Sequence, residues 1–141
     1  FVPSRGLGDV YKRQALIFKH FFNSISRERK SVFAAFSARV GSISDNKIGG
    51  WHSYRASKSA LNMIIKNFSI EISRKYKNNI IVGLHPGTVD SKLSKPFQKN
   101  VPTEKLFSGE YSALKIVKVL DSLSIQDTGK CFDFNSLEVF P

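Results

Sequence analysis

Short apolar runs alternate with longer segments of helical spacing along this chain. Residues 31–37, 79–84 and 130–134 have the length of strands, and the first two are apolar enough to be buried on both faces. Residues 54–76 and 110–123 place their apolar side chains three and four positions apart, as amphipathic helices do. Strands that alternate with helices form parallel sheets with right-handed crossovers. The sequence therefore predicts an α/β fold.

The start of the chain differs from the rest. Residues 15–26 have the pattern of a mostly buried helix. Residues 1–14 have no clear period, are rich in glycine and arginine, and resemble a translated sequencing adaptor. We therefore expect residues 1–14 to be non-native, irregular and poorly packed, and residues 15–141 to form the domain.

Composition excludes several classes of protein. Of 141 residues, 41% are apolar and 23% are charged, which is ordinary for a globular domain. The net charge is +11, but the lysines are scattered, so we expect a solvated basic surface and no nucleic-acid partner. No apolar run approaches the roughly 20 residues that span a bilayer, so we expect no membrane partner. The lone Cys131 favours a cytoplasmic location, and the three histidines lack metal-ligand spacing, so we expect no metal.

The predicted helix over residues 54–76 begins with a candidate acid–base pair. Tyr54 and Lys58 are four positions apart, so their side chains share one helix face. At about 5 Å and an effective dielectric of about 20, an ammonium stabilises a phenolate by roughly 3 kcal/mol, or about two pKa units. The spacing predicts a tyrosine with a lowered pKa that could serve as a general acid or base near neutral pH.

Three stretches carry a family resemblance. Residues 37–62 contain Ser-Ala-Arg-Val-Gly-Ser before the Tyr54–Lys58 pair, residues 85–91 read His-Pro-Gly-Thr-Val-Asp-Ser, and residues 129–134 read Gly-Lys-Cys-Phe-Asp-Phe. Together they resemble the short-chain dehydrogenase/reductase family, in its sniffer and C-factor-like branch. The resemblance implies an incomplete Rossmann-type doubly wound parallel sheet, of which this chain is the C-terminal half.

The resemblance also implies roles for individual residues. Tyr54 would exchange a proton with the substrate oxygen, and Lys58 would lower the pKa of Tyr54 and bind the nicotinamide ribose. The family's nicotinamide-lining loop would be formed by Pro86, Gly87, Thr88 and Val89, with Thr88 reaching the carboxamide. Trp51 and His52 would shape the substrate pocket.

The serine of the family's site is left open by the sequence. Many relatives have two serines after the strand, and the second one binds the substrate oxygen. Here the pair reads Ser37-Ala38, so Ser37 is the best candidate, Ser42 is the next, and Ala38 in the catalytic position would mean that the serine is missing.

The resemblance implies an NAD(P)-dependent oxidoreductase that acts on a small carbonyl or alcohol. The cofactor would be NAD or NADP, with NADP slightly favoured. The chain has no glycine-rich dinucleotide loop, so we expect it to be an N-terminally truncated fragment that is inactive alone. The alternative is a C-factor-like signalling or interaction protein that retains the fold. Relatives pair helices corresponding to 15–26 and 54–76, so we expect a full-length homodimer or homotetramer.

Overall fold

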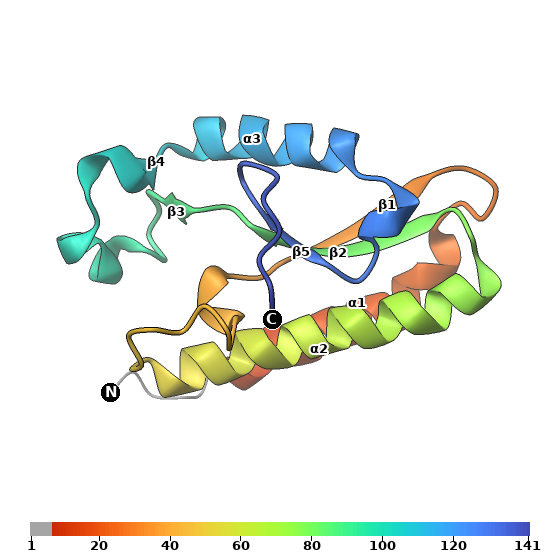
Figure 1. Cartoon of the computed structure of the whole chain (residues 1–141), viewed down its shortest axis with the longest axis horizontal. Coiled ribbons are helices and arrows are strands. Elements are labelled where there is room, and N and C mark those ends of the chain that lie inside the picture. Colours follow the sequence, from red (N-terminus) through yellow and green to blue (C-terminus); the bar gives the residue numbers. More distant parts are fainter. Residues whose placement is uncertain (1–6) are drawn as a thin grey trace.

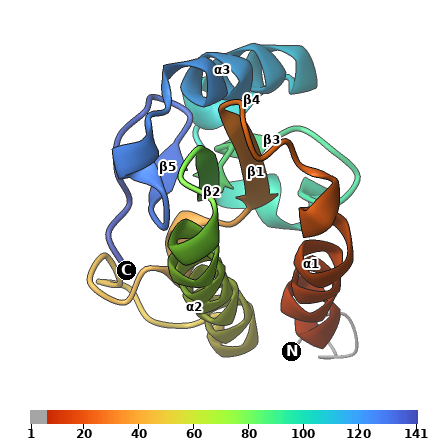
Figure 2. The same ribbon diagram turned by 90° about the vertical axis from the view of Figure 1, so that its right-hand side faces the viewer.

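A computed structural model describes residues 7–141 as three layers, with a parallel sheet between two layers of helices (Figure 1). The sheet contains β1 (Ser31–Phe36), β2 (Asn79–His85) and β5 (Cys131–Asp133), in the order β1-β2-β5. Helices α1 (Leu7–Phe21) and α2 (His52–Lys75) cover one face, and α3 (Gly109–Ser122) covers the other (Figure 2). The predicted α/β class and the parallel sheet are confirmed.

Strand β2 lies in the centre and divides the core into two clusters. Its Ile80, Val82 and Leu84 pack against Ile116 and other residues of the α3 side. On the opposite face, Ile81 packs with a second cluster from α1, α2 and β1, formed by Phe18, Ala35, Leu61, Ile65 and Ile72. The alternation of faces along a strand explains why every second residue of β2 joins the same cluster.

Strand β1 is less buried than the sequence predicted. It pairs with β2 alone among the described residues, and four of its six residues, Ser31 to Ala34, are only half-buried. Phe36 at its end is 58% exposed. Both faces of β1 still contact the core, with Val32 and Ala34 against the α3-side cluster and Phe33 and Ala35 against the other, so the predicted burial on both faces is confirmed only in part.

The crossovers also differ from the prediction. The chain steps across the sheet in one direction, from β1 through β2 to β5, yet α2 and α3 lie on opposite faces (Figure 2). Two such connections have opposite hands, so one of them is left-handed and the prediction of right-handed crossovers is wrong for that one. Residues 86–108 separate β2 from α3, and a connection of that length can carry the chain around to the other face.

The first helix begins earlier than predicted. Helix α1 covers Leu7–Phe21, and the 3-10 turn Phe22–Ser24 follows it. Tyr11 packs against the core cluster beneath α2. The expectation of irregular structure is therefore wrong from residue 7 onward, and the half-buried Tyr11 and Gln14 contradict poor packing at those positions, whereas residues 1–6 lie outside the described part of the chain. The non-native origin of residues 1–14 stays a prediction.

The segment between β2 and α3 contains short regular elements. Short strands β3 (Thr88–Val89) and β4 (Leu106–Phe107) pair in parallel, and 3-10 turns occupy Lys95–Asn100 and Thr103–Lys105. Gly87 has a φ of +79°, and a Cβ there would lie 2.6 Å from the Phe107 ring. Only glycine therefore fits this turn without strain.

Two further 3-10 turns, Arg39–Gly41 and Ile125–Asp127, precede α2 and β5 respectively. None of the helices described over residues 7–141 combines the length and the apolar character needed to cross a bilayer.

Candidate active site

The Tyr54–Lys58 pair lies in the first turns of α2, beyond the carboxyl end of β1. Helix α2 follows Trp51, which adopts a left-handed conformation with φ of 47°. Lys58 Nζ is 5.9 Å from the centre of the Tyr54 ring and donates a hydrogen bond to the Phe36 carbonyl oxygen at 3.0 Å. The ammonium is therefore held between the end of β1 and the phenol, on the side of the sheet where ligands of such folds bind.

The same spacing occurs again on α3, where it has a different setting. Lys115 Nζ lies 5.6 Å from the centre of the Tyr111 ring, but it donates to Asn135 Oδ1 and not to a strand end. Spacing alone therefore does not distinguish the two pairs. Only the pair on α2 lies where the β1 carbonyl and helix N-terminus meet.

Burial shifts both pKa values of the pair. Desolvation of the phenolate raises the pKa of Tyr54, and desolvation of the ammonium lowers the pKa of Lys58. The sequence predicted a lowered pKa for Tyr54. That prediction is wrong for this structure, because Lys58 donates its hydrogen bond to Phe36 and the loss of water outweighs the distant charge.

Ser37 is buried directly after β1, and its hydroxyl is already bonded. Ser37 Oγ donates to Asn62 Oδ1 at 2.5 Å, and the Ser37 backbone N–H donates to the Leu84 carbonyl oxygen at 2.8 Å. Asn62 lies on α2, one turn beyond Lys58. The candidate serine is therefore fixed between β1, β2 and α2.

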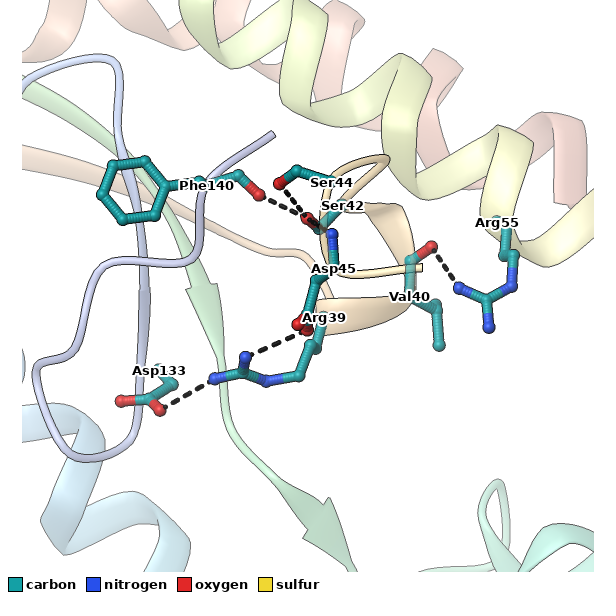
Figure 3. Close-up of polar contacts among 8 residues, drawn as sticks. All are labelled: Arg39, Val40, Ser42, Ser44, Asp45, Arg55, Asp133 and Phe140. Atoms are coloured by element: carbon teal, nitrogen blue, oxygen red, sulfur yellow. Dashed lines mark hydrogen bonds and ion pairs between the residues drawn. The ribbon is translucent and has the colours of Figure 1, made fainter. Parts of the chain in front are cut away.

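Ser42, the second candidate, is buried beside the C-terminal tail. Its hydroxyl contacts the carbonyl oxygen of Phe140, and it lies 3.3 Å from Ser44 Oγ (Figure 3). Ser42 Oγ also accepts the Asp45 backbone N–H at 3.1 Å. These contacts tie the segment before α2 to the last residues of the chain.

Arg39 forms an ionic bridge within the same segment. Its Nη1 binds Asp45 Oδ2 at 3.0 Å, and its Nη2 binds Asp133 Oδ2 at 3.2 Å, as Figure 3 shows. Asp133 ends β5 and is buried, and its other oxygen accepts the backbone N–H groups of Asn135 and Leu137. Arg39 thus links the end of β1 to the end of β5.

His85 ends β2 and precedes the predicted nicotinamide-lining loop. Burial, with help from the positive charges of Arg39 and Lys58 and against the effect of Asp133, lowers the pKa of His85 to about 4. Its Nδ1 is buried without a hydrogen-bond partner among the described residues. His85 is therefore neutral at pH 7, at the same sheet edge as Lys58.

Of the predicted loop residues, Pro86 accepts the Ser112 hydroxyl at its carbonyl oxygen, at 2.9 Å. Thr88 and Val89 form β3, and both are half-buried. Because they follow His85 directly, the structure places all four loop residues, Pro86, Gly87, Thr88 and Val89, beyond the carboxyl end of the central strand.

Sequence reasoning missed Asn62 and Arg39. Asn62 follows Tyr54 and Lys58 at the same four-residue interval, so a polar residue on the face that must contact the sheet was a usable signal. Arg39 had no such signal, since its partners are 6 and 94 positions away. No group of three or more metal-ligating side chains occurs in residues 7–141.

Similarity to known proteins supports this picture. The chain is 37% identical over 95 residues to 1-hydroxy-2-glutathionyl-2-methyl-3-butene dehydrogenase of Rhodococcus sp. (strain AD45). This alignment covers 67% of the chain and 39% of that protein. The chain is 31% identical over 106 residues to C-signal of Myxococcus xanthus, which covers 75% of the chain and 58% of that protein. No protein-family model matches the chain.

Solved structures with the same fold include the carbonyl reductase Sniffer of D. melanogaster, with a TM-score of 0.67 and 25% identity over 79% of the chain and 41% of that structure. The chain belongs to the short-chain dehydrogenase/reductase family. An NADPH-bound carbonyl reductase from chicken fatty liver matches all of the chain and 58% of its own length, with a TM-score of 0.77 and 22% identity, which supports the Rossmann fold.

Family membership explains the parallel sheet between two layers of helices. The chain spans 39% and 58% of the lengths of the two short-chain dehydrogenase/reductase relatives described above.

Proposed function

We propose that this chain supplies the acid–base half of an NAD(P)-dependent oxidoreductase that acts on a small carbonyl or alcohol. The observation that carries the proposal is the Tyr54–Lys58 pair at the carboxyl edge of a parallel sheet. The dehydrogenase from Rhodococcus and the Sniffer carbonyl reductase, both similar to this chain, support the reaction class.

The raised pKa of Tyr54 favours one direction of this reaction. A phenol with a raised pKa stays protonated near pH 7, so Tyr54 is in the form that donates a proton to a carbonyl oxygen. A bound nicotinamide dinucleotide would supply the hydride for the carbonyl carbon. Proton and hydride together convert the carbonyl to an alcohol, and Tyr54 regains its proton from solvent.

The residues at the sheet edge fit such a cofactor. The buried Nδ1 of His85, which has no hydrogen-bond partner among the described residues, lies where the loop Pro86–Gly87–Thr88–Val89 begins, and it is free to bond a polar ligand. Lys58 would hold the nicotinamide ribose, and Thr88 would bind the carboxamide. We propose NADP as the slightly preferred cofactor, since two matching structures, from chicken fatty liver and Burkholderia multivorans, contain NADPH or NADP.

Of the two serine candidates, Ser37 remains the proposed site serine, because it lies at the end of β1 beside the helix that carries the pair. Ser42 is held against the C-terminal tail. A cytoplasmic location stays a prediction from the lone cysteine.

The test is carbonyl reduction by a protein of the relatives' full length that carries this chain. Tyr54→Phe should lower kcat by about 10² to 10⁴ and leave NADPH affinity nearly unchanged, because the phenolic proton serves the chemistry. Lys58→Ala should weaken both kcat and cofactor binding. The matched controls are Tyr111→Phe and Lys115→Ala, which remove the equally spaced pair on α3.

Equal losses from the two pairs would contradict the assignment of Tyr54 and Lys58. Residues 1–141 alone should show no turnover with NADH or NADPH, because the sequence contains no glycine-rich loop for the pyrophosphate. Turnover by residues 1–141 would refute that expectation.

A second candidate function is signalling, favoured by the 31% identity to C-signal of Myxococcus xanthus. A signalling protein could retain the fold without catalysis. Dinucleotide binding by the longer protein, measured by calorimetry, discriminates the two: binding with turnover supports the enzyme, and neither binding nor turnover supports the signal.

We also propose that the outer face of α1 and α2 pairs two copies of the protein. Apolar side chains on this face are largely exposed: Leu16, Ile17, Phe21, Met63 and Ile70. Sedimentation of the longer protein should show a dimer or tetramer, and Met63→Glu should shift it toward monomer. A monomer at every concentration would contradict the assembly.

A further inference from the structure

Among the described residues of α2, Asn62 bonds both the residue that follows β1 and the first residue of β5. Its Oδ1 accepts the Ser37 hydroxyl at 2.5 Å and the Cys131 thiol at 3.3 Å. Ser37 follows β1 and Cys131 begins β5, so the amide spans the central strand.

Gly83 of β2 allows Asn62 and Cys131 to meet, because glycine has no side chain. Gly83 pairs in register with both Ala35 and Cys131. A Cβ on Gly83 would lie within 2.4 Å of Cys131 Sγ, so the thiol occupies the space that a side chain would fill. The sulfur thereby lies over β2, within reach of Asn62.

Three side chains of the first turns of α2 bond the end of β1 and the segment that follows it. Lys58 Nζ binds the Phe36 carbonyl oxygen at 3.0 Å, Asn62 binds Ser37, and Ser59 Oγ donates to the Gly41 carbonyl oxygen at 2.8 Å. Of these three bonds, the one to Lys58 is exposed, whereas those of Asn62 and Ser59 are partly buried, and only Asn62 also bonds Cys131.

The bond to Asn62 also decides what Ser37 can offer a substrate. A serine hydroxyl carries one proton and two acceptor lone pairs. The Ser37 proton is donated to Asn62, so Ser37 can accept a hydrogen bond but has no proton left for a carbonyl oxygen. In this arrangement Tyr54 is the proton donor of the proposed reaction.

We propose that Asn62 is a positioning residue of the proposed site, which acts by fixing Ser37 and the end of β1 beneath the Tyr54–Lys58 pair. Its catalytic consequence rests on the proposed oxidoreductase function. Its structural part, the shared bond to Ser37 and Cys131, does not.

The structural part is tested on residues 1–141 through the thiol. Cys131 is the single cysteine of the chain, and burial raises its pKa to about 11, so labelling of the native protein should be slow. Asn62→Leu removes the acceptor and should speed labelling by a thiol reagent at least about tenfold. Asn62→Asp keeps an acceptor at the same position and should label no faster than the parent protein.

The matched control is Ser73→Ala, which removes a hydroxyl bonded to Ser69 elsewhere on α2 and should change the rate less than about twofold. A parent rate in Asn62→Leu, with the fold intact by circular dichroism, would overturn the shared bond. Equal acceleration in Ser73→Ala would overturn it as well, because removal of any hydrogen bond of α2 would then expose the thiol to the reagent.

The catalytic part is tested in the full-length reductase by a double-mutant cycle. Ser37→Ala and Asn62→Leu should each lower kcat about tenfold with unchanged KM for NADPH, and the double variant should be no slower than the slower single. Asn62→Asp should recover most of kcat. Multiplying losses, or a loss of thermal stability without a loss of kcat, would overturn the positioning role.

An inactive parent protein would refute the proposed function and not the thiol result, so the two failures are distinguishable.

Discussion

Gly41 lies in close contact with α2, and Gly41→Ala tests that approach. A Cβ at Gly41 would lie 2.8 Å from both the carbonyl carbon and the Cβ of Lys58, and 3.0 Å from Asn62 Nδ2. Lys58 is held within a 24-residue helix, so its backbone cannot yield. The segment 39–41 must retreat instead, and the Ser59–Gly41 hydrogen bond of 2.8 Å lengthens with it.

The expected cost follows from these two effects. Overpacking a close contact costs about 1–3 kcal/mol, and a typical hydrogen bond contributes about 0.5–1.5 kcal/mol. Gly41→Ala should therefore lower the free energy of unfolding by about 2–4 kcal/mol. For a chain of this length that corresponds to a decrease in Tm of about 10 °C.

The assay is urea unfolding followed by far-ultraviolet circular dichroism, with Gly109→Ala as the matched control. Gly109 begins α3, and no atom lies within 4 Å of its added Cβ. This control should be neutral or more stable by about 0.4–1 kcal/mol, since alanine restricts the unfolded chain. A Gly41→Ala loss below about 0.5 kcal/mol, against the overpacking range, would refute the close approach, and equal losses in both variants would refute its local cause.

Two further predictions concern charge. The pKa of His85 is about 4 in the folded protein and about 6.5 in the unfolded chain, so the unfolded state binds more protons between these pH values. The free energy of unfolding should therefore fall by up to about 3 kcal/mol as the pH decreases from 6.5 to 4. His85→Gln should flatten this slope, whereas the exposed His20→Gln should retain it, and an unchanged slope in the first variant would contradict the assignment. Asp133→Ala should lower the free energy of unfolding by about 3 kcal/mol, because two backbone N–H groups and Arg39 lose a buried acceptor. Asp45→Ala removes the exposed partner of Arg39 and should lower it by less than about 1 kcal/mol. Chemical denaturation of both variants checks the difference, and equal costs would count against it.

The secondary structure and its order were readable from local pattern. The spacing of Leu61, Ile65 and Ile72 predicted α2, and the run Ile80–Leu84 predicted β2. Both predictions were possible because a helix with one buried face and a buried central strand each leave a pattern of apolar residues that are close in sequence. The Tyr54–Lys58 pair was found in the same way, since both residues lie on one helix.

Contacts between distant segments were not readable in this way. The sequence placed an ammonium beside a phenol and predicted a lowered pKa for Tyr54, but the carbonyl oxygen of Phe36, 22 positions before Lys58, receives the Lys58 hydrogen bond. Arg39 likewise finds Asp133, 94 positions away.

By itself, then, the sequence determined the α/β class, most of the helices and strands, and the shared helix face of Tyr54 and Lys58, because these depend on periodicity and on residues a few positions apart. The tertiary structure alone decided the opposite faces of α2 and α3, the direction in which the pKa of Tyr54 shifts and the bond that commits Ser37 to Asn62. Each of these depends on which groups meet and lose water when remote segments pack, and one-dimensional spacing does not contain that information.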